Sequence, residues 1–290
     1  MRRTLLVLSL VAAGSCAARS AAPPITTTTP AAASATRPHE NLNAVLWMQT
    51  ALEYEASAVQ AYRQALLQLE SAQKDVAWSA ALEQTSDGSK LSPAVILDID
   101  ETVLDNSSYQ ARQVRDNTPF TAETWDRWCL EARATAIPGA LEFTREADKR
   151  GVAVFYITNR TANLEEATRK NLAALGFPLE SGADTVLTRG ERPEWQASAK
   201  GPRRAHVAAT HRVLLLIGDD LGDFVVDAAG TPEQRAARTA PQAGWWGRRW
   251  IMLPNPTYGS WERAIIGGAA DAVIAKRAAL RYETSPIPNR

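Results

Sequence analysis

The chain of 290 residues is poor in cysteine and histidine and carries no surplus of charge. Its two cysteines, Cys16 and Cys129, cannot build the framework of a disulfide-stapled scaffold. The three histidines, at positions 39, 206 and 211, lack the spacing of a zinc site. Lys and Arg number 32, as do Asp and Glu, so no net charge attracts a nucleic acid polymer. After Cys16 no apolar run is long enough to span a bilayer.

Residues 1–15 have the pattern of a signal peptide, because a basic tip is followed by a short apolar run. Ala13, Gly14 and Ser15 stand directly before Cys16, and this order resembles the lipobox of bacterial lipoproteins, in which the cysteine is acylated after cleavage. The lipobox usually has Leu where this chain has Ala13. We therefore expect an exported protein of the bacterial cell envelope, held to a membrane by a lipid anchor on Cys16. The alternative is an ordinary secretion signal, an incidental cysteine and a periplasmic protein.

Residues 16–40 are rich in Ala, Thr, Pro and Ser, which predicts a flexible linker. Residues 41–88 are predicted to be a helical region, because from Leu42 to about Glu83 apolar residues recur at helical spacing. We expect one long helix or a helical hairpin there. The turn-forming residues Ser86-Asp87-Gly88 end it.

In residues 89–290 short apolar runs rich in branched side chains alternate with helical stretches. The apolar runs are Ala94–Leu97, Val152–Ile157, Val213–Ile217 and Trp250–Leu253. The helical stretches include Pro138–Lys149 and Leu164–Leu175. Continuous apolar strands that alternate with helices indicate a parallel sheet buried on both faces. The sequence therefore predicts the α/β class, with a Rossmann-like parallel sheet covered by helices.

Polar clusters follow three of these runs. In chain order they are Asp98-Ile99-Asp100-Glu101-Thr102, Thr158-Asn159-Arg160 and Gly218-Asp219-Asp220-Leu221-Gly222-Asp223. In open parallel sheets ligands bind at the carboxyl ends of the strands. We therefore expect the three clusters to converge on one site.

The residue types in these clusters suit phosphate chemistry with a hard cation. Asp98, Asp100 and Asp219 offer only oxygen ligands, the kind that Mg²⁺ prefers. A carboxylate can attack phosphorus to form an aspartyl-phosphate, and a second carboxyl can transfer the protons. Thr158, Asn159 and a cation such as Lys200 could hold the phosphate oxygens.

At these residues the sequence resembles the haloacid dehalogenase (HAD) superfamily. More narrowly, it resembles the class C acid phosphatases of subfamily IIIB, bacterial surface lipoproteins that dephosphorylate nucleoside monophosphates and similar esters. The blocks that carry this resemblance are Leu46-Trp47-Met48-Gln49, Leu104-Asp105-Asn106-Ser107, Trp125-Asp126-Arg127-Trp128, Ala136-Ile137-Pro138-Gly139-Ala140 and Leu253-Pro254-Asn255-Pro256. The resemblance implies a HAD fold with a small α-helical cap, formed by the N-terminal helical region and an insertion at about 109–136.

The resemblance also implies roles for the acidic residues. Asp98 would be the nucleophile and a magnesium ligand. Asp100 would be the general acid/base, with its backbone carbonyl on the metal. Asp219 would be a direct metal ligand, and Asp223 would orient a metal-bound water or Lys200.

Further roles are implied for the residues around the substrate. Thr158 and Asn159 would bind phosphate together with Lys200. Arg160 and Arg203 would support these three residues. Trp125 and Tyr258 occupy positions that flank the ring of a substrate in the family, and flat side chains stack with any aromatic group. Trp125 could instead be an ordinary core residue.

One position departs from the family pattern. Asp220 stands where relatives often carry Asn. The additional carboxylate could tighten metal binding or raise the pKa of neighbouring groups, and the sequence leaves both alternatives open.

The sequence therefore predicts a Mg²⁺-dependent acid phosphatase, with 5′-nucleotidase activity as one form of it, acting on small phosphorylated substrates. The rival hypothesis is a catalytically silent surface lipoprotein that binds a phosphorylated ligand. Asp98 discriminates between them, because an inactive relative is expected to lose the nucleophile. Phosphotransfer to an alcohol instead of water stays open, as does a homo-oligomeric state.

Overall fold

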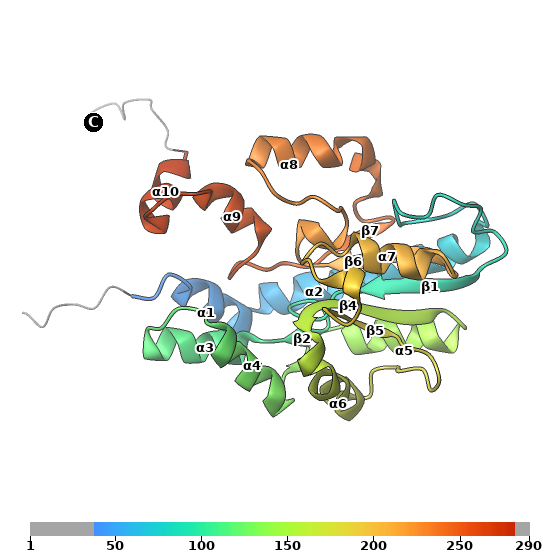
Figure 1. The fold of residues 1–290 in the computed structure, drawn as a ribbon, viewed down its shortest axis with the longest axis horizontal. Helices are drawn as coiled ribbons and strands as arrows, with labels where there is room; N and C mark the ends of the chain where they lie inside the picture. Colours follow the sequence, from blue (N-terminus) through green and yellow to red (C-terminus); the bar gives the residue numbers. More distant parts are fainter. Residues whose placement is uncertain (1–37, 282–290) are drawn as a thin grey trace, which may run out of the picture. The chain divides into compact units, whose positions relative to one another are not determined.

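The computed structural model describes residues 38–281 with their side chains. The predicted signal peptide, Cys16 and most of the predicted linker lie outside the described residues. Within the described part, helices surround one central sheet (Figure 1). No helix in that part of the chain has the length and the apolar character needed to cross a membrane.

The central sheet has five parallel strands in the order β5-β4-β1-β6-β7. The strands are β1 (Ser92–Leu97), β4 (Ala153–Thr161), β5 (Val186–Arg189), β6 (His211–Gly218) and β7 (Trp250–Met252). The predicted parallel α/β class is therefore confirmed, and four of the strands are the predicted apolar runs. The prediction missed β5, because this edge strand has only four residues and two of them are polar.

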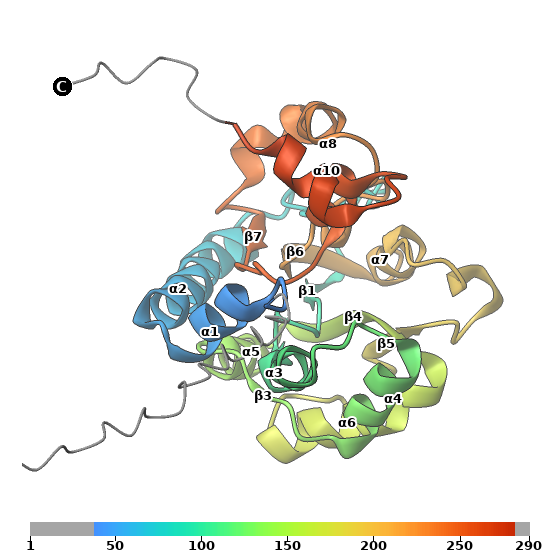
Figure 2. The same ribbon diagram turned by 90° about the vertical axis from the view of Figure 1, so that its left-hand side faces the viewer.

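Alternate residues of the strands pack into separate cores on the two faces of the sheet, as the pleat of a strand requires, except on β6, where Leu214 and Leu215 join the same core. On β1, Val95 and Leu97 join one core, whereas Ala94 and Ile96 join the other. Helices α2 (Leu52–Lys74), α5 (Ala140–Lys149) and α6 (Glu165–Leu175) cover the first face, and α7 (Gly201–Ala208) covers the second. Figure 2 shows α2 and α7 on opposite sides of the sheet.

The N-terminal helical region is shorter than predicted. Helix α1 (Leu42–Thr50) is separated from α2 by Ala51, whose backbone is extended, and α2 ends at Lys74. The prediction of helix as far as Glu83 is therefore wrong. The Ala-rich segment after Lys74 instead binds to β6. There the Trp78 indole donates to the carbonyl of Leu214 at 2.7 Å, and tertiary contacts of this kind override the weak local helical preference.

Two helices are inserted between β1 and α5, in the region that the sequence assigns to the cap. They are α3 (Ser107–Asp116) and α4 (Ala122–Glu131), enclosed by the two-stranded antiparallel pair β2 (Leu104–Asp105) and β3 (Thr135–Ala136). Asn171 of α6 holds the end of this insertion, because its amide bonds both the N–H and the carbonyl of Ala134, at 3.0 and 2.9 Å. The insertion is thus fastened beside the first face of the sheet.

The chain after β6 completes the second face and the C-terminal part. Its helices are α8 (Pro232–Thr239), α9 (Ser260–Ile266) and α10 (Ala272–Ala279). The short 3₁₀ helices η3 (Leu221–Asp223) and η4 (Ala240–Trp245) also lie in this part. Two others, η1 (Ala162–Leu164) and η2 (Pro193–Trp195), lie before β6. Trp245 and Trp246 pack edge-on against the buried Trp250 of β7, so this aromatic pair contributes to the core.

Helix α2 offers a direct test of the packing against the sheet. Leu69 is fully buried in the first core, whereas Leu67 on the same helix is 65% exposed. We expect Leu69→Ala to lower the free energy of unfolding by about 2–5 kcal/mol, because it leaves a cavity. Leu67→Ala is the matched control and should change it by less than about 0.5 kcal/mol. Urea unfolding measures both, and equal effects would contradict the described packing of α2.

Candidate active site

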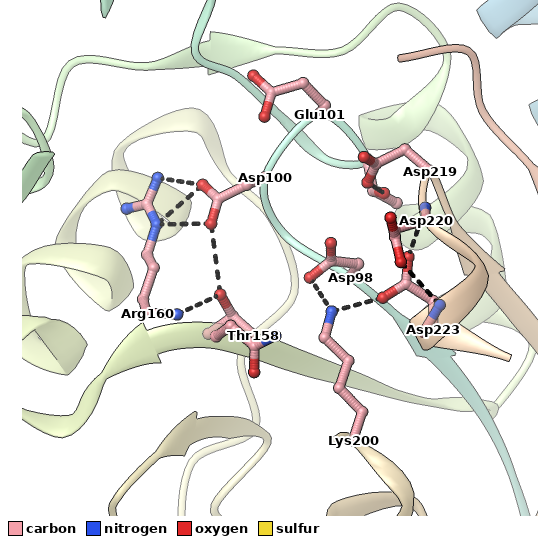
Figure 3. Close-up of polar contacts among 12 residues, drawn as sticks. Asp98, Asp100, Glu101, Thr158, Arg160, Lys200, Asp219, Asp220 and Asp223 are labelled. Carbon is pink, nitrogen blue, oxygen red and sulfur yellow. Dashed lines mark hydrogen bonds and ion pairs between the residues drawn. The ribbon is translucent and has the colours of Figure 1, made fainter. Parts of the chain in front are cut away.

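The predicted acidic residues lie with Thr158 and Lys200 at the carboxyl ends of the neighbouring strands β4, β1 and β6 (Figure 3). Asp98 directly follows β1, and its N–H donates to the carbonyl of Ile217 on β6 at 2.9 Å. Asp219 directly follows β6. Thr158 was expected just past its strand, but β4 continues to Thr161 with a register shift against β5, so Thr158 lies within the strand.

A buried ion-pair network joins Asp98, Lys200 and Asp223 (Figure 3). The Lys200 ammonium contacts a carboxylate oxygen of Asp98 and lies 2.6 Å from Oδ1 of Asp223. Burial alone would lower the pKa of Lys200, but the Asp223 and Asp98 carboxylates outweigh burial and raise it. Burial raises the pKa of Asp98 to about 7, against the opposing effect of Lys200. Lys200 therefore stays charged beside the candidate nucleophile.

Three carboxylates form an acidic cluster at this point. Asp98, Asp219 and Asp223 each place one oxygen within 4.8 Å of the others. Asp219 accepts hydrogen bonds from Thr102 Oγ1 at 2.8 Å and Asn255 Nδ2 at 2.9 Å. Burial, followed by the charge of Asp98, raises the pKa of Asp219 well above its ordinary value.

The acidic cluster fits a hard divalent cation. One lysine charge cannot balance three closely spaced carboxylates, of which Asp223 is buried and the other two are partly buried, and desolvated charges need partners. The donors are oxygen atoms only, the set that Mg²⁺ and similar ions prefer. The sequence placed Asp98, Asp219 and the backbone carbonyl of Asp100 on the metal, and the structure also brings the Asp223 carboxylate to the cluster of Asp98 and Asp219.

The Asp100 side chain lies outside the acidic cluster and faces Arg160 (Figure 3). Arg160 donates to Oδ1 of Asp100 from Nη2 at 2.7 Å and from Nε at 3.0 Å. Asn106 Nδ2 donates to the same oxygen at 2.9 Å. Because the guanidinium of Arg160 is buried, this is a desolvated and charge-assisted contact. A contribution of Asp100 to a metal would therefore have to come from its backbone carbonyl, as the resemblance implies.

The Asp220 carboxylate is not part of the acidic cluster either. Its carboxylate accepts from the N–H of Gly222 at 2.8 Å and from Oγ of Ser260 at 2.8 Å, and it also accepts from the Ser260 N–H. Burial would raise its pKa, but the hydrogen bonds from Ser260 and Gly222 lower it below the ordinary value. This carboxylate therefore fastens the segment after β7 and is not one of the candidate metal ligands.

Arg203 orients the candidate phosphate-binding residues of β4. Its buried guanidinium donates to the Thr158 carbonyl and, at 2.8 Å, to Oδ1 of Asn159. Burial lowers the pKa of Arg203 to about 10. The Thr158 hydroxyl accepts the N–H of Arg160 at 3.1 Å and lies 3.5 Å from Oδ2 of Asp100. Thr158 thus contacts both Arg203 and the general acid/base candidate Asp100, whereas Asn159 contacts Arg203.

The two aromatic candidates lie on different segments. Tyr258 is 38% exposed, and its hydroxyl donates to the buried carboxyl of Glu101. Trp125 of α4 is partly buried, with the Arg160 guanidinium 5.5 Å from its ring. Among the described residues Trp125 packs against the rings of Tyr109 and Phe120 and not against Tyr258. A substrate ring that contacted both side chains would therefore lie between α4 and the segment after β7.

Two residues with a clear place in the site were not among the predicted candidates. Glu101 is fully buried in a left-handed conformation, with φ of 57°, and burial raises its pKa to about 8. Asn255 binds Asp219 from the segment after β7. The sequence holds a signal for each, because Glu101 adjoins Asp100 and Asn255 lies within one of the family blocks.

A parallel sheet with an aspartate after β1, a threonine on β4, a lysine before α7 and aspartates after β6 has the arrangement of a phosphatase site of the HAD type. More specifically, the chain belongs to the HAD superfamily, subfamily IIIB (Acid phosphatase), whose family model matches residues 16–261. Its class is therefore that of the phosphomonoesterases.

Solved structures agree with this assignment. A class C acid phosphatase from Bacillus anthracis is 32% identical, with a TM-score of 0.71, over 85% of this chain and 98% of that one. A structure of the class C acid phosphatase from Bacillus anthracis with tungstate bound is 31% identical, with a TM-score of 0.72, over 85% of this chain and 99% of that one.

Two plant proteins match over shorter stretches. Acid phosphatase 1 of Solanum lycopersicum is 32% identical over 82 residues, 28% of this chain and 32% of that protein. The stem 28 kDa glycoprotein of Glycine max is 21% identical over 166 residues, 56% of this chain and 58% of that protein. The chain thus spans about a third of the length of the Solanum lycopersicum protein and less than three fifths of the length of the Glycine max protein.

The raised pKa values predict that cation binding depends on pH. In the metal-free protein Asp98, with a pKa of about 7, is protonated at lower pH, and a divalent cation must displace that proton. We expect the affinity for Mg²⁺ to fall as the pH drops below 7, by up to about tenfold per pH unit for each proton displaced. Calorimetric titration of chelator-treated protein between pH 5 and 8 measures this.

The control for this titration is Asp227→Asn, which changes an exposed carboxylate that is paired with Arg238. It should bind Mg²⁺ like the unmodified protein at every pH, whereas Asp219→Asn should bind it much more weakly. An affinity that is constant across this pH range would show that the buried carboxylates do not bind the cation.

Proposed function

We propose that this protein is a Mg²⁺-dependent acid phosphatase that hydrolyses phosphate monoesters through an aspartyl-phosphate on Asp98. The observation that carries the proposal is the contact of the Asp98 carboxylate with the buried Lys200 ammonium, beside Asp219 and Asp223. A nucleophile that must approach a phosphate dianion needs positive charge close to it, and this arrangement supplies one fixed cation and a place for a second.

In the first step an oxygen of Asp98 attacks phosphorus, and the bond from phosphorus to the ester oxygen breaks. Asp100 gives a proton to that oxygen, so the alcohol leaves neutral. Lys200, which contacts Asp98, and the Thr158 hydroxyl would bind the phosphate oxygens as charge shifts onto them. Mg²⁺ held by Asp98, Asp219 and Asp223 would supply charge neutralisation for the phosphate and the carboxylates.

In the second step water attacks the phosphorus of the aspartyl-phosphate and releases phosphate. Asp100, now ionised, takes the proton of that water, and Asp98 returns as a free carboxylate. Arg160 and Thr158 hold Asp100 within the site throughout both steps. The same carboxyl thus acts as acid first and as base afterwards.

We propose nucleoside monophosphates and aromatic monoesters as the substrates. Tyr258 is 38% exposed and contacts Glu101, which adjoins Asp100, and stacking of a base on an aromatic side chain contributes about 1–3 kcal/mol with little preference for the base. The tungstate bound to the Bacillus anthracis relative supports a site for a tetrahedral oxyanion, because tungstate has the shape and charge of phosphate.

The Asp98→Asn variant tests the nucleophile. We expect hydrolysis of p-nitrophenyl phosphate at acidic pH to fall at least about 10³-fold, because an amide oxygen is a poor nucleophile. Asp227→Asn, which changes an exposed carboxylate, is the matched control and should keep full activity. Retained turnover in Asp98→Asn would refute the proposed mechanism. An inactive unmodified protein that still binds phosphate would favour the silent-lipoprotein hypothesis.

We also propose that the protein is exported and anchored in the bacterial cell envelope through an acylated Cys16. The support is the short apolar run and the small residues before that cysteine. We expect Cys16→Ser to move the protein from the membrane fraction to the soluble fraction, measured by immunoblotting after cell fractionation. An unchanged distribution between the two fractions would show that Cys16 is not the anchor.

A further inference from the structure

Asn106 lies at the junction of the nucleophile-bearing loop and the inserted helices. It precedes α3 in the chain and is fully buried. Asparagine at this position ordinarily caps the helix with its side chain, but Asn106 makes no capping bond. The neighbouring Asp105 instead accepts the N–H of Ser107 at 2.7 Å. The buried side-chain amide of Asn106 therefore forms hydrogen bonds with groups other than the N-terminus of α3.

The hydrogen bonds of Asn106 point to Asp100. Its Nδ2 donates to Oδ1 of Asp100 at 2.9 Å. Its Oδ1 accepts from Nε1 of Trp128 at 2.8 Å and from Nη2 of Arg160 at 3.3 Å. Its backbone N–H donates to Oε1 of Glu101 at 3.0 Å. The amide thus links the cap helix α4, which carries Trp128, to the general acid/base candidate.

The orientation of this amide follows from the chemistry of its partners. The indole N–H of Trp128 and the guanidinium of Arg160 can only donate, so the oxygen of Asn106 must face them. Its NH₂ group must then face Asp100, whose carboxylate accepts. A flipped amide would place NH₂ against two donors, which leaves buried donors unpaired.

Asn106 makes the two oxygens of Asp100 unequal. Oδ1 receives the short bonds, from Arg160 Nη2 at 2.7 Å and from Asn106 at 2.9 Å. Oδ2 has only the longer contacts, with Arg160 Nε at 3.3 Å and Thr158 Oγ1 at 3.5 Å. The proton of a carboxylic acid is carried by the oxygen that accepts fewer donors, because a donor hydrogen and an acid proton compete for the same lone pairs.

We propose that Asn106 is a positioning residue for Asp100. It occupies Oδ1 and thereby presents Oδ2 as the atom that gives its proton to the leaving oxygen, while Trp128 fixes the orientation of Asn106. This rests on the proposed role of Asp100 as general acid. When the bond from phosphorus to oxygen breaks, the proton moves from Oδ2 to the leaving oxygen, and Asp100 is left as the carboxylate that Arg160 stabilises.

A pair of aryl esters tests this role. Phenyl phosphate and p-nitrophenyl phosphate present the same ring, but phenolate leaves much less readily than nitrophenolate and needs the acid more. We expect Asn106→Ala to lower kcat/KM for phenyl phosphate at least about tenfold more than for p-nitrophenyl phosphate. A role in folding alone would lower both values by the same factor.

Two further variants separate a positioning role of Asn106 from a general effect on folding. Trp128→Phe keeps the ring but removes the indole N–H, so it should show the same selective loss at smaller size, even where Asn106→Ala folds poorly. Trp250→Phe is the matched control, because it removes a buried indole bond, to the carbonyl of Ala80 at 2.9 Å, in the core on the second face of the sheet. It should not discriminate between the esters.

Asp100→Asn separates this inference from the proposed function. It should show the largest selective loss for phenyl phosphate. If Asp100→Asn discriminates but Asn106→Ala and Trp128→Phe lower both esters equally, the positioning role of Asn106 is refuted and the acid role of Asp100 stands. If Asp100→Asn itself does not discriminate, the acid role and the inference that rests on it both fail.

Discussion

The mutual repulsion of buried carboxylates is the constraint on which this site depends. Asp98, Asp219 and Asp223 place oxygens within 4.8 Å of one another, and Asp223 is buried while the other two are partly buried. Lys200 compensates only part of that charge, and burial raises the pKa values of Asp98 and Asp219. This repulsion costs stability, and it suits the acidic cluster to a divalent cation, whose charge would offset that of the carboxylates.

The surrounding acids are held in place by donors from distant segments. Asn255, Tyr258 and Ser260, all after β7, donate to Asp219, Glu101 and Asp220 in that order. This segment is therefore fastened to both the β1 and the β6 loops. Through its contact with Glu101, the partly exposed Tyr258 is held close to the acidic residues of the site.

The sequence predicted the sheet well where burial is simple. The apolar runs at β1, β4 and β6 could hardly be anything but buried strands, because their residues pack on both faces. It failed at β5, where half the residues are polar, and after Lys74, where a helical pattern gives way to contacts with β6. In both places the outcome depends on a partner strand far away in the chain, which local periodicity does not contain.

The sequence by itself determined the chemistry of the site: acids after β1 and β6, a threonine on β4 and a lysine before α7, because side-chain types and their order are enough to specify donors, acceptors and charge. Only the tertiary structure decided where each carboxylate points. Asp223 joins Asp98 and Asp219, Asp220 turns to Ser260, and Asp100 faces Arg160 and Asn106. The reason is physical, since a carboxylate turns to whichever donors the fold brings within about 3 Å, and those donors come from segments that only folding brings together.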